Sequence, residues 1–250
     1  KRYLLGIGNT NDINCWSGIP YFILKSAKNL SFKLEGKNLN YKNLFLAKLF
    51  WYVKQFIKYR NYSGFQYSDF FINNLIEKLN ISIDKKSTFI SHYPFLPSIP
   101  FSEKWNIYYY IDATTSQIFD HYGLFKTMPK SLKRKVLEKE KDNYIRSKAI
   151  FCFSEWAKNS LINDYQISSK KIFVYPAGAN IDINNLSKFI KDDSIPLIPT
   201  KTNPLRIGFL GKEWERKGGP FLISLVNYLN SKGIPTSLRV VGVNKKIIPK

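Results

Sequence analysis

Acidic residues are scarce in this chain of 250 residues, since 18 Asp and Glu stand against 39 Lys and Arg and give a formal net charge of +21. An excess of this size favours an anionic partner or surface. The lysines are spread along the chain, however, and the sequence is also rich in Asn, Ile, Phe and Tyr, whose codons are A/T-rich. Genome composition therefore explains the same excess, and the charge does not identify a partner.

Cysteine is nearly absent as well. Cys15 and Cys152 lie far apart, which excludes a disulfide framework and a C-x-x-C pair and suits a reducing compartment. No apolar run reaches the ~18 residues of a membrane span, and no signal peptide opens the sequence. We expect a cytoplasmic protein. Because an expected strand lies directly against each end, we also expect this sequence to be part of a longer protein.

Two common phosphate-binding motifs are missing from the stretch Leu205–Leu229, LRIGFLGKEWERKGGPFLISLVNYL, which has neither the Gly-Lys-Ser/Thr ending of a Walker loop nor G-x-G-x-x-G. What it does contain is an apolar strand, then Gly211, a charged loop and a helix that begins at Gly218-Gly219-Pro220. Such a unit presents backbone N–H groups to an anion. Lys212 and Lys217 bracket the loop, so a phosphate-bearing ligand is one interpretation. An ordinary turn with solvated lysines is the other.

The opening of the chain has the same design. A strand over Lys1–Ile7 runs into Gly8, a polar loop follows, and Gly18-Ile19-Pro20 leads into a helix that ends near Asn29. Gly8 and Gly18 would let a ligand approach the backbone closely. Alternatively, this glycine segment is only a helix start with proline in its first turn.

Strands and helices alternate along the whole chain, which predicts an α/β fold with a parallel sheet. The expected strands are Lys1–Ile7, Ser87–Ser91, Asn106–Ile111, Ala149–Phe153, Lys171–Tyr175, Leu205–Leu210 and Ser237–Gly242. We predict two Rossmann-like domains, residues 1–190 and 205–250, with a linker at 191–204 and the second domain truncated. In open parallel sheets ligands bind beyond the carboxyl ends of the strands, so the site residues should follow them.

The helix Asn43–Arg60 is strongly amphipathic, with leucines, Phe50 and Val53 on one face and lysines mostly on the other. Trp51 falls among the lysines, which fits a helix lying on an anionic membrane surface at the inner face of the membrane. We favour the alternative, in which the apolar face packs on the sheet and the lysines extend to solvent. A second helix, Lys130–Lys148, is highly charged and is expected to be a solvated surface.

Several polar residues follow expected strands. Asp112 could bind an acceptor hydroxyl or accept its proton, or it could be the N-cap of the next helix, and both interpretations stay open. Ser154 is expected to cap a helix from Glu155 to about Asp164. His92 and His121 are the two histidines of the sequence, and a surface or loop-anchoring role is favoured for each.

Four segments resemble the family 4 retaining glycosyltransferases. SEWAKNSLINDYQISSKKIFVYPAGANID, Ser154–Asp182, is similar to that family's S-x-W-A … Y-x-[IV] … K-I-x-V-x-P-x-G-[AV]-[ND] segment. LGKEWERKGG resembles its G-[RK] … K-G diphosphate loop, GIGNTNDINCWSGIPYFI its first glycine-bearing loop, and YYYIDATTSQIFDHY the acceptor-side strand and loop of one branch. There are two departures: Asp112 stands where many members carry His, and the family's E-x7-E carboxylates would fall beyond residue 250.

The resemblance implies the GT-B architecture, with two Rossmann-like domains facing across a cleft, and transfer of a sugar from a nucleotide-sugar to a glycan or lipid-linked acceptor with retention. It implies donor-diphosphate binding by Gly211, Lys212, Arg216 and Lys217, and acceptor-side positions at Thr114, Ser154 and Trp156. The catalytic candidate, Asp112, comes from its own position at the end of an expected strand and not from the resemblance, because many members of the family have His there. With the two lysines neutralising the leaving diphosphate, neither a protein-bound metal nor a cofactor other than the donor itself is expected.

Two other functions compete with this one. Charge and aromatic content suggest a nucleic-acid-binding α/β module, but no clustered basic-aromatic motif supports it and we expect no nucleic-acid partner. A non-catalytic sugar-binding relative would have the same residues over this stretch. Peripheral contact with an anionic membrane is a separate expectation that depends on the helix Asn43–Arg60.

Overall fold

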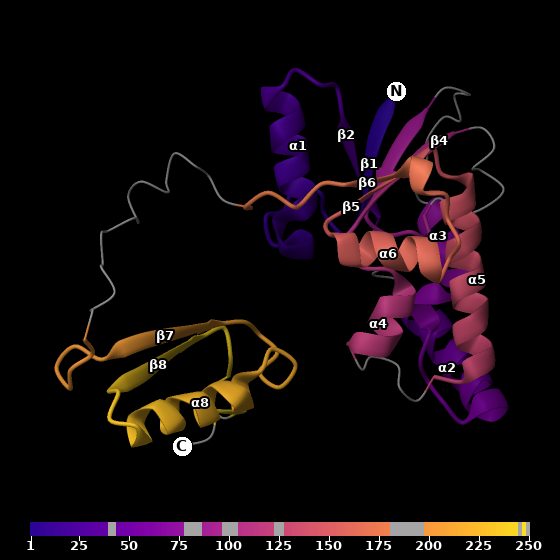
Figure 1. Ribbon diagram of the computed structural model, residues 1–250. Helices are drawn as coiled ribbons and strands as arrows, with labels where there is room; N and C mark the ends of the chain where they lie inside the picture. The colour runs from indigo at the N-terminus through magenta and orange to yellow at the C-terminus, as the bar shows by residue number, and fades with distance from the viewer. Residues whose placement is uncertain are drawn as a thin grey trace. The chain divides into compact units, whose positions relative to one another are not determined.

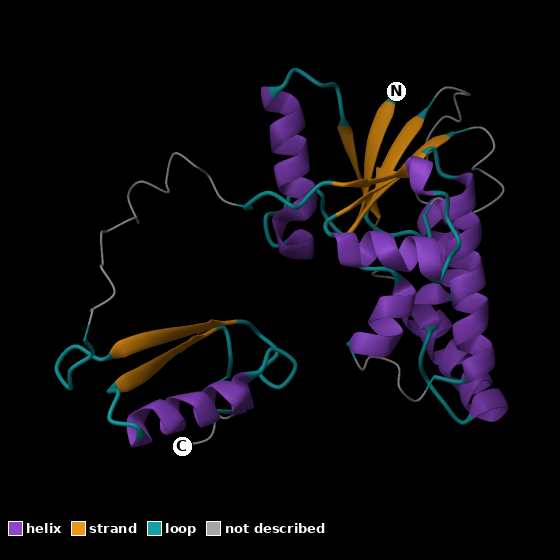
Figure 2. Cartoon of the chain, viewed as in Figure 1, coloured by secondary structure: helices purple, strands orange, loops and turns teal. Residues whose placement is uncertain are grey.

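The computed structural model describes residues 1–39, 44–77, 87–96, 105–122, 128–180, 198–244 and 247–248. The chain divides into two compact units, Lys1–Asn180 (unit 1) and Ile181–Lys250 (unit 2). Each unit has a parallel sheet of its own (Figures 1 and 2). Within the linker predicted at 191–204, residues 191–197 lie outside the described part of the chain.

Unit 1 is built on a six-stranded sheet in which every pairing is parallel. Its strands are β1 (Arg2–Ile7), β2 (Glu35–Leu39), β3 (Thr88–Ser91), β4 (Asn106–Ile111), β5 (Ala149–Cys152) and β6 (Ile172–Val174), in the order β2-β1-β3-β4-β5-β6. The α/β prediction with a Rossmann-like parallel sheet is therefore confirmed for unit 1. The edge strand β2 was not predicted, because EGKNL is polar and without a clear alternation.

Helices cover both faces of this sheet. They are α1 (Ile19–Asn29), α2 (Phe45–Tyr59), α3 (Asp69–Glu77), α4 (Thr115–His121), α5 (Lys130–Arg146) and α6 (Glu155–Asn163), and short 3-10 turns lie at Cys15–Gly18, Phe65–Tyr67 and Ser169–Lys171. In Figure 1, α1 lies on one side of the sheet, and α3, α5 and α6 on the other. The core forms on the second side, where buried residues of these three helices meet Tyr3, Phe89, Tyr109 and Ile150.

Helix α5 corrects one expectation. Its sequence is highly charged, yet Val136, Glu140, Asn143 and Tyr144 are buried along one face. The remaining charged positions are mostly exposed, and Arg134 and Glu138 form an exposed i,i+4 pair. The helix is therefore part of the core layer rather than a fully solvated surface.

Helix α2 corrects a second expectation, because its apolar face is turned away from the protein. Phe50 is 81% exposed, whereas Gln55, on the opposite face, is only 6% exposed. Trp51 is half-buried and packs edge-on against Phe65, with ring centroids 6.2 Å apart. The favoured packing, apolar face on the sheet, is therefore wrong. The proposed role of Trp51 as a membrane-facing side chain is wrong for the same reason.

Unit 2 consists, among its described residues, of β7 (Leu205–Leu210), α8 (Gly219–Ser231) and β8 (Thr236–Val241), with β7 and β8 paired in parallel over six residues. One face of this sheet is sheltered by α8 and carries Ile207, Phe209, Leu238 and Val240. Side chains on the other face are exposed, as the alternating burial of both strands shows. The predicted strand–loop–helix–strand unit is confirmed.

Candidate functional site

The strand order of unit 1 reverses between β1 and β3. From β1 the chain crosses to β2 on one side, and later strands are added on the other side, starting with β3. Loops that leave the carboxyl ends at such a switch point run apart and leave a crevice, which is where ligands bind in open parallel sheets. A cavity of about 610 Å³ lies there, lined by Ile7 from the end of β1 and by Tyr93, two residues beyond β3.

Aromatic side chains dominate the walls of this cavity. The lining residues are Ile7, Trp16, Leu44, Phe45, Lys48, Tyr52, Tyr62, Ser63, Gly64, Phe65, Gln66, Phe71 and Tyr93. Lys48 contributes the one cationic group, and the lining contains no carboxylate among the described residues. A concave aromatic site with a few polar groups is typical of a binding pocket. Flat rings of this kind also suit the apolar faces of sugar rings.

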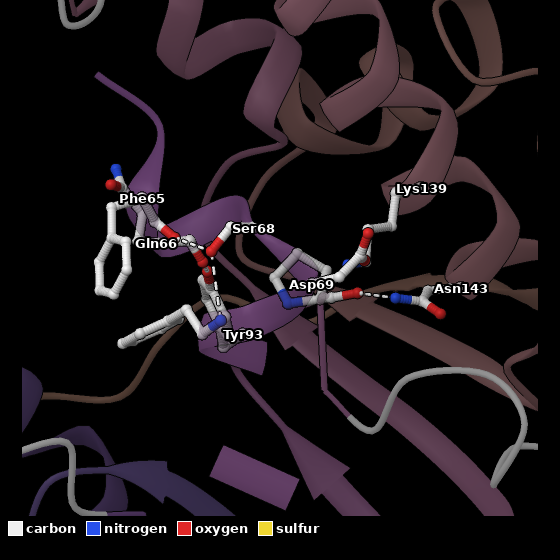
Figure 3. A network of polar contacts seen from close by, with 9 residues as sticks. Phe65, Gln66, Ser68, Asp69, Tyr93, Lys139 and Asn143 are labelled. Atoms are coloured by element: carbon white, nitrogen blue, oxygen red, sulfur yellow. Dashed lines mark hydrogen bonds and ion pairs between the residues drawn. The ribbon is translucent and has the colours of Figure 1, made fainter. Parts of the chain in front are cut away.

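Hydrogen bonds hold one wall of the cavity in place, as the close-up in Figure 3 shows. The hydroxyl of Tyr93 donates to the backbone oxygen of Gln66 over 2.7 Å, and Ser68 donates to the backbone oxygen of Phe65 over 2.7 Å. Lys139 on α5 pairs with Asp69 at the start of α3. The turn that carries Phe65 and Gln66 is thereby fixed to β3 on one side and, through α3, to α5 on the other.

The loop between β1 and α1 forms the opposite side, and Thr10 anchors it. The backbone N–H and the hydroxyl of Thr10 both donate to Oδ1 of Asn38 in β2, over 2.8 and 2.7 Å. Thr10 is fully buried over Gly6 and Gly36, and a Cβ at either glycine would come within 2.5 Å of its side chain. Glycine at both positions therefore makes room for the residue that holds the loop down.

The same loop contains a run of left-handed residues, Trp16 (φ 48°), Ser17 (φ 56°) and Gly18 (φ 83°). Non-glycine residues in this conformation cost energy and tend to occur at functional sites. Gly18 is buried and is the N-cap of α1, with Pro20 in the first turn, so the helix-start interpretation of Gly18 holds. Gly8 also has a positive φ of 111° and donates its N–H to Leu39.

His92 lies directly after β3, and its contact with Trp16 was not predicted. Its ring contacts Trp16 edge-on at 4.3 Å, and Trp16 Nε1 donates to the backbone oxygen of Ile7 over 2.8 Å. Both ring nitrogens of His92 are buried without a hydrogen-bond partner, and burial lowers the pKa of His92 to about 4. A neutral, unpartnered imidazole therefore supports the tryptophan of the cavity wall. Of the two roles expected for His92, the surface role is wrong, whereas the loop-anchoring role agrees with the contact to Trp16.

Asp112 is exposed at the carboxyl end of β4, and its Oδ1 accepts the N–H of Ala113 over 2.9 Å. It is not the N-cap of α4. That position belongs to Thr114, which forms a capping box with Gln117, so the cap interpretation of Asp112 is wrong. Thr114 itself is fully buried and bonds Ser160 over 2.7 Å, so its side chain does not reach the surface of the protein. Asp112 is not among the residues that line the described cavity.

The loop after β5 gives a mixed result. Ser154 is the N-cap of α6 and accepts the N–H of Ala157, as predicted. Trp156 is 43% exposed and its ring contacts that of His121, an exposed residue at the end of α4, at 5.3 Å. Trp156 and Asp112 thus both follow neighbouring strands at the same edge of the sheet.

A buried carboxylate fixes the loop that carries Asp112. Glu140 of α5 accepts the first N–H of α4, from Thr115, over 3.1 Å and hydroxyl hydrogen bonds from Tyr144 and Tyr165. Burial raises the pKa of Glu140 to about 7, although these hydrogen bonds act in the opposite direction. Glu140 is therefore a structural clamp on the start of α4 and does not reach solvent.

In unit 2 the loop between β7 and α8 is anchored by Trp214. This side chain is 3% exposed and packs against Phe209, with ring centroids 5.0 Å apart. A Cβ at Gly219 would lie 2.1 Å from the indole, so glycine is required beneath it. Gly218, the N-cap of α8, has φ 81° and open space on its side-chain side.

The three cations of this loop lie in different surroundings. Lys217 folds over Gly211, since a Cβ at Gly211 would lie 2.5 Å from Lys217 Cδ and 3.2 Å from Nζ. Arg216 instead makes two hydrogen bonds to Glu213, over 2.7 and 2.9 Å, and the pKa of Glu213 is lowered as a result. Lys212 is exposed. The four residues predicted for the diphosphate are therefore on one loop, with the Lys217 ammonium nearest the end of β7.

Within the described ranges, no group of three or more His, Cys, Asp or Glu side chains could hold a metal ion. Nor does any described helix combine the length and apolar character needed to cross a bilayer. No protein-family model matches the chain, and no curated protein matches it either. The fold that can be stated is therefore a general one: α/β with a six-stranded parallel sheet flanked by helices.

Proposed function

We propose that this chain contributes to a retaining glycosyltransferase of the GT-B architecture, with unit 1 on the acceptor side and unit 2 beginning the nucleotide-sugar domain. The supporting observation is the cavity at the switch point of unit 1, between the ends of β1 and β3. Its aromatic walls suit a sugar acceptor. The resemblance of four sequence segments to family 4 supports the same assignment.

The loop after β7 is the proposed donor-diphosphate site. The Lys217 ammonium lies over Gly211 at the carboxyl end of β7. The N–H groups of Gly218 and Gly219 are bonded within the loop, to Glu215 and Trp214, so the cation carries this proposal. A leaving diphosphate gains negative charge as the glycosidic bond breaks, and a fixed cation stabilises that charge. Arg216 is committed to Glu213, so we assign the main contact to Lys217, with Lys212 as a second cation at the loop entrance.

On the acceptor side, the cavity would hold the sugar ring against Trp16, Tyr52 and Tyr62. Asp112 lies at the same sheet edge and is exposed, so its carboxylate is available to an acceptor hydroxyl. Its position one strand away from β3 makes it a candidate for orienting the acceptor. A glycan or a lipid-linked sugar fits equally well.

The first test is binding of nucleoside diphosphates to the 250-residue chain. Calorimetry and backbone amide shifts of Gly211–Gly219 should report binding at this loop. A charge-assisted contact contributes roughly 1.5–3 kcal/mol, so Lys217→Ala should weaken binding by about tenfold or more. Lys212→Ala should have a smaller effect, because the Lys217 side chain and not that of Lys212 lies against Gly211 at the end of β7.

Arg216→Ala is the matched control, because the neighbouring guanidinium is bonded to Glu213. It should leave the affinity within about threefold. Unchanged affinity in both lysine variants, or loss only in Arg216→Ala, would refute the assignment. Stronger, salt-dependent binding of random oligonucleotides than of nucleoside diphosphates would instead favour a nucleic-acid-binding function.

A further inference from the structure

The outer face of α2 is the largest group of exposed apolar side chains in the described structure. Its members are Phe45, Leu46, Leu49, Phe50, Val53, Phe56 and Ile57, and their exposed fractions run from 36% at Phe56 to 81% at Phe50. At 3.6 residues per turn these seven positions fall within an arc of about 140° on one side of the helix. We call this arc the outer face of α2.

Lysines lie on both sides of the outer face. On the helical wheel Lys54 and Lys58 follow one edge, Lys48 lies beyond the other, and the segment Phe45–Tyr59 contains no Asp or Glu. The inward side carries Trp51 and Gln55 instead, which pack toward the protein. The outer face therefore combines an apolar stripe with a purely cationic border.

A groove between α2 and α5 extends the positive charge. It has a volume of about 340 Å³ and is lined by Lys54, Lys58, Lys135 and Lys139, while Asp69 is the one carboxylate among its described lining residues. Asp69 is paired with Lys139, which leaves three lysine ammonium groups at the groove without an acidic partner in the described part of the chain.

We infer that the outer face of α2 docks on an anionic lipid bilayer, with its apolar side chains among the acyl chains and its lysines at the headgroups. A helix with an apolar face and a cationic border binds membranes in this way, and each lysine near an anionic surface adds about 1 kcal/mol. A second copy of the chain fits less well, because a two-fold contact would bring the lysine borders of both copies together.

The inference differs from the sequence-based expectation in the residue that meets the lipid. Trp51 faces inward, and Phe50 takes the outermost position. It does not depend on the proposed glycosyltransferase function, because vesicle binding is measured without donor or acceptor. Phe45 and Lys48 also line the switch-point cavity, so docking would bring the cavity close to the bilayer surface.

The experiment is sedimentation of the full chain with vesicles of phosphatidylcholine alone and of phosphatidylcholine with phosphatidylglycerol. Binding should require the anionic lipid and fall as salt rises. Phe50→Ser should weaken partitioning by about tenfold, because the side chain would no longer be buried in lipid. Lys54→Gln and Lys58→Gln should each weaken it by about fivefold on the anionic vesicles.

Ile145→Ser is the matched control, because Ile145 is an exposed apolar residue on α5, outside the outer face of α2. It should leave partitioning unchanged, and circular dichroism should show that both serine variants fold. A Phe50→Trp variant should also show stronger quenching by brominated lipid than the wild type, because the new indole lies on the outer face of α2 and Trp51 does not. The inference fails if no anionic vesicle is bound, if Phe50→Ser binds as well as the wild type, or if ultracentrifugation finds a dimer that Phe50→Ser dissociates.

Discussion

In each unit one strand–loop–helix segment ends its loop in a left-handed glycine N-cap, β1 to α1 in unit 1 and β7 to α8 in unit 2, and the two loops differ in how they place their tryptophan. Both loops end in a left-handed glycine N-cap, Gly18 and Gly218, with φ of 83° and 81°. In unit 2 the tryptophan is buried and anchors the loop, which leaves cations exposed. In unit 1 Thr10 is the anchor, and Trp16 is 44% exposed on the wall of a cavity.

The difference lies in the kind of side chain that each loop exposes. A loop anchored by a buried indole can display Lys217 over the strand end, which suits an anion. A loop anchored by a small hydroxyl residue leaves its indole for an aromatic site, which suits a largely neutral ring. The two loops therefore both end in a left-handed glycine, but one exposes a cation and the other an indole.

The largest difference between the two loops is expected when each tryptophan is replaced by alanine. Replacing a buried tryptophan by alanine costs about 3–5 kcal/mol, so Trp214→Ala should unfold the described part of unit 2 or nearly so. Trp16→Ala should cost far less, because that side chain is half exposed. Hydrogen exchange measured by mass spectrometry on β7 and β8 peptides should rise sharply in Trp214→Ala and stay unchanged in Trp16→Ala. Equal protection of β7 and β8 in both variants would contradict the anchoring role.

The next largest expected difference is in how the stability of the two units depends on pH. His92, under Trp16, has its folded pKa lowered to about 4 from an ordinary 6.5. As pH falls the unfolded chain binds the proton first, so stability present above pH 6.5 is lost below it. Between pH 7 and pH 5 the His92 contribution falls by about 2 kcal/mol. Glu140 acts in the opposite direction over this range, because its folded pKa is raised to about 7 and the folded chain binds that proton first. The His92 contribution is therefore the difference between the wild type and His92→Phe, and urea unfolding monitored in β1 and β3 peptides should show that the variant gains about 2 kcal/mol relative to the wild type as pH falls from 7 to 5.

Unit 2 is the internal control for the pH experiment, because both histidines of the chain lie in unit 1. Protection of the β7 and β8 amides should change little over the same pH range once intrinsic exchange is corrected. A His92→Phe variant whose stability changes between pH 7 and pH 5 by the same amount as that of the wild type would show that His92 does not carry the effect.

Much of the fold follows from local sequence. The Gly-x-Pro helix starts and the Ser154 cap were predicted because each acts over a few residues. The helical spacing of apolar residues identified α2 but not its orientation. Such spacing defines an apolar and a polar face, but it does not say which face packs against the protein. The inward side was decided by Phe65, an aromatic partner that is distant from Trp51 in sequence.

The site was less predictable, for related reasons. Asp112 and Thr114 are both good cap residues two positions apart, and the backbone after β4 selected Thr114. Among the loop cations, Arg216 is distinguished from Lys217 only by its hydrogen bonds to Glu213. His92 gave no local signal at all, because its burial depends on Trp16 from another strand–loop unit.

The smallest expected effect is the loss of stability when either N-cap glycine is replaced. It tests whether both loops need a left-handed residue at that position. A left-handed conformation costs an alanine about 1–2 kcal/mol. Gly218→Ala should show only this cost, because no atom lies within 4 Å of the added Cβ. Gly18→Ala should cost more, since its Cβ would lie 3.2 Å from the Ile13 oxygen and from the Phe22 ring. Asparagine tolerates the left-handed region, so Gly218→Asn should recover part of the loss whereas Gly18→Asn should not. Urea unfolding of the four variants measures the order, and equal losses for Gly18→Ala and Gly218→Ala would mean that the backbone around Gly18 relaxes to admit the methyl group.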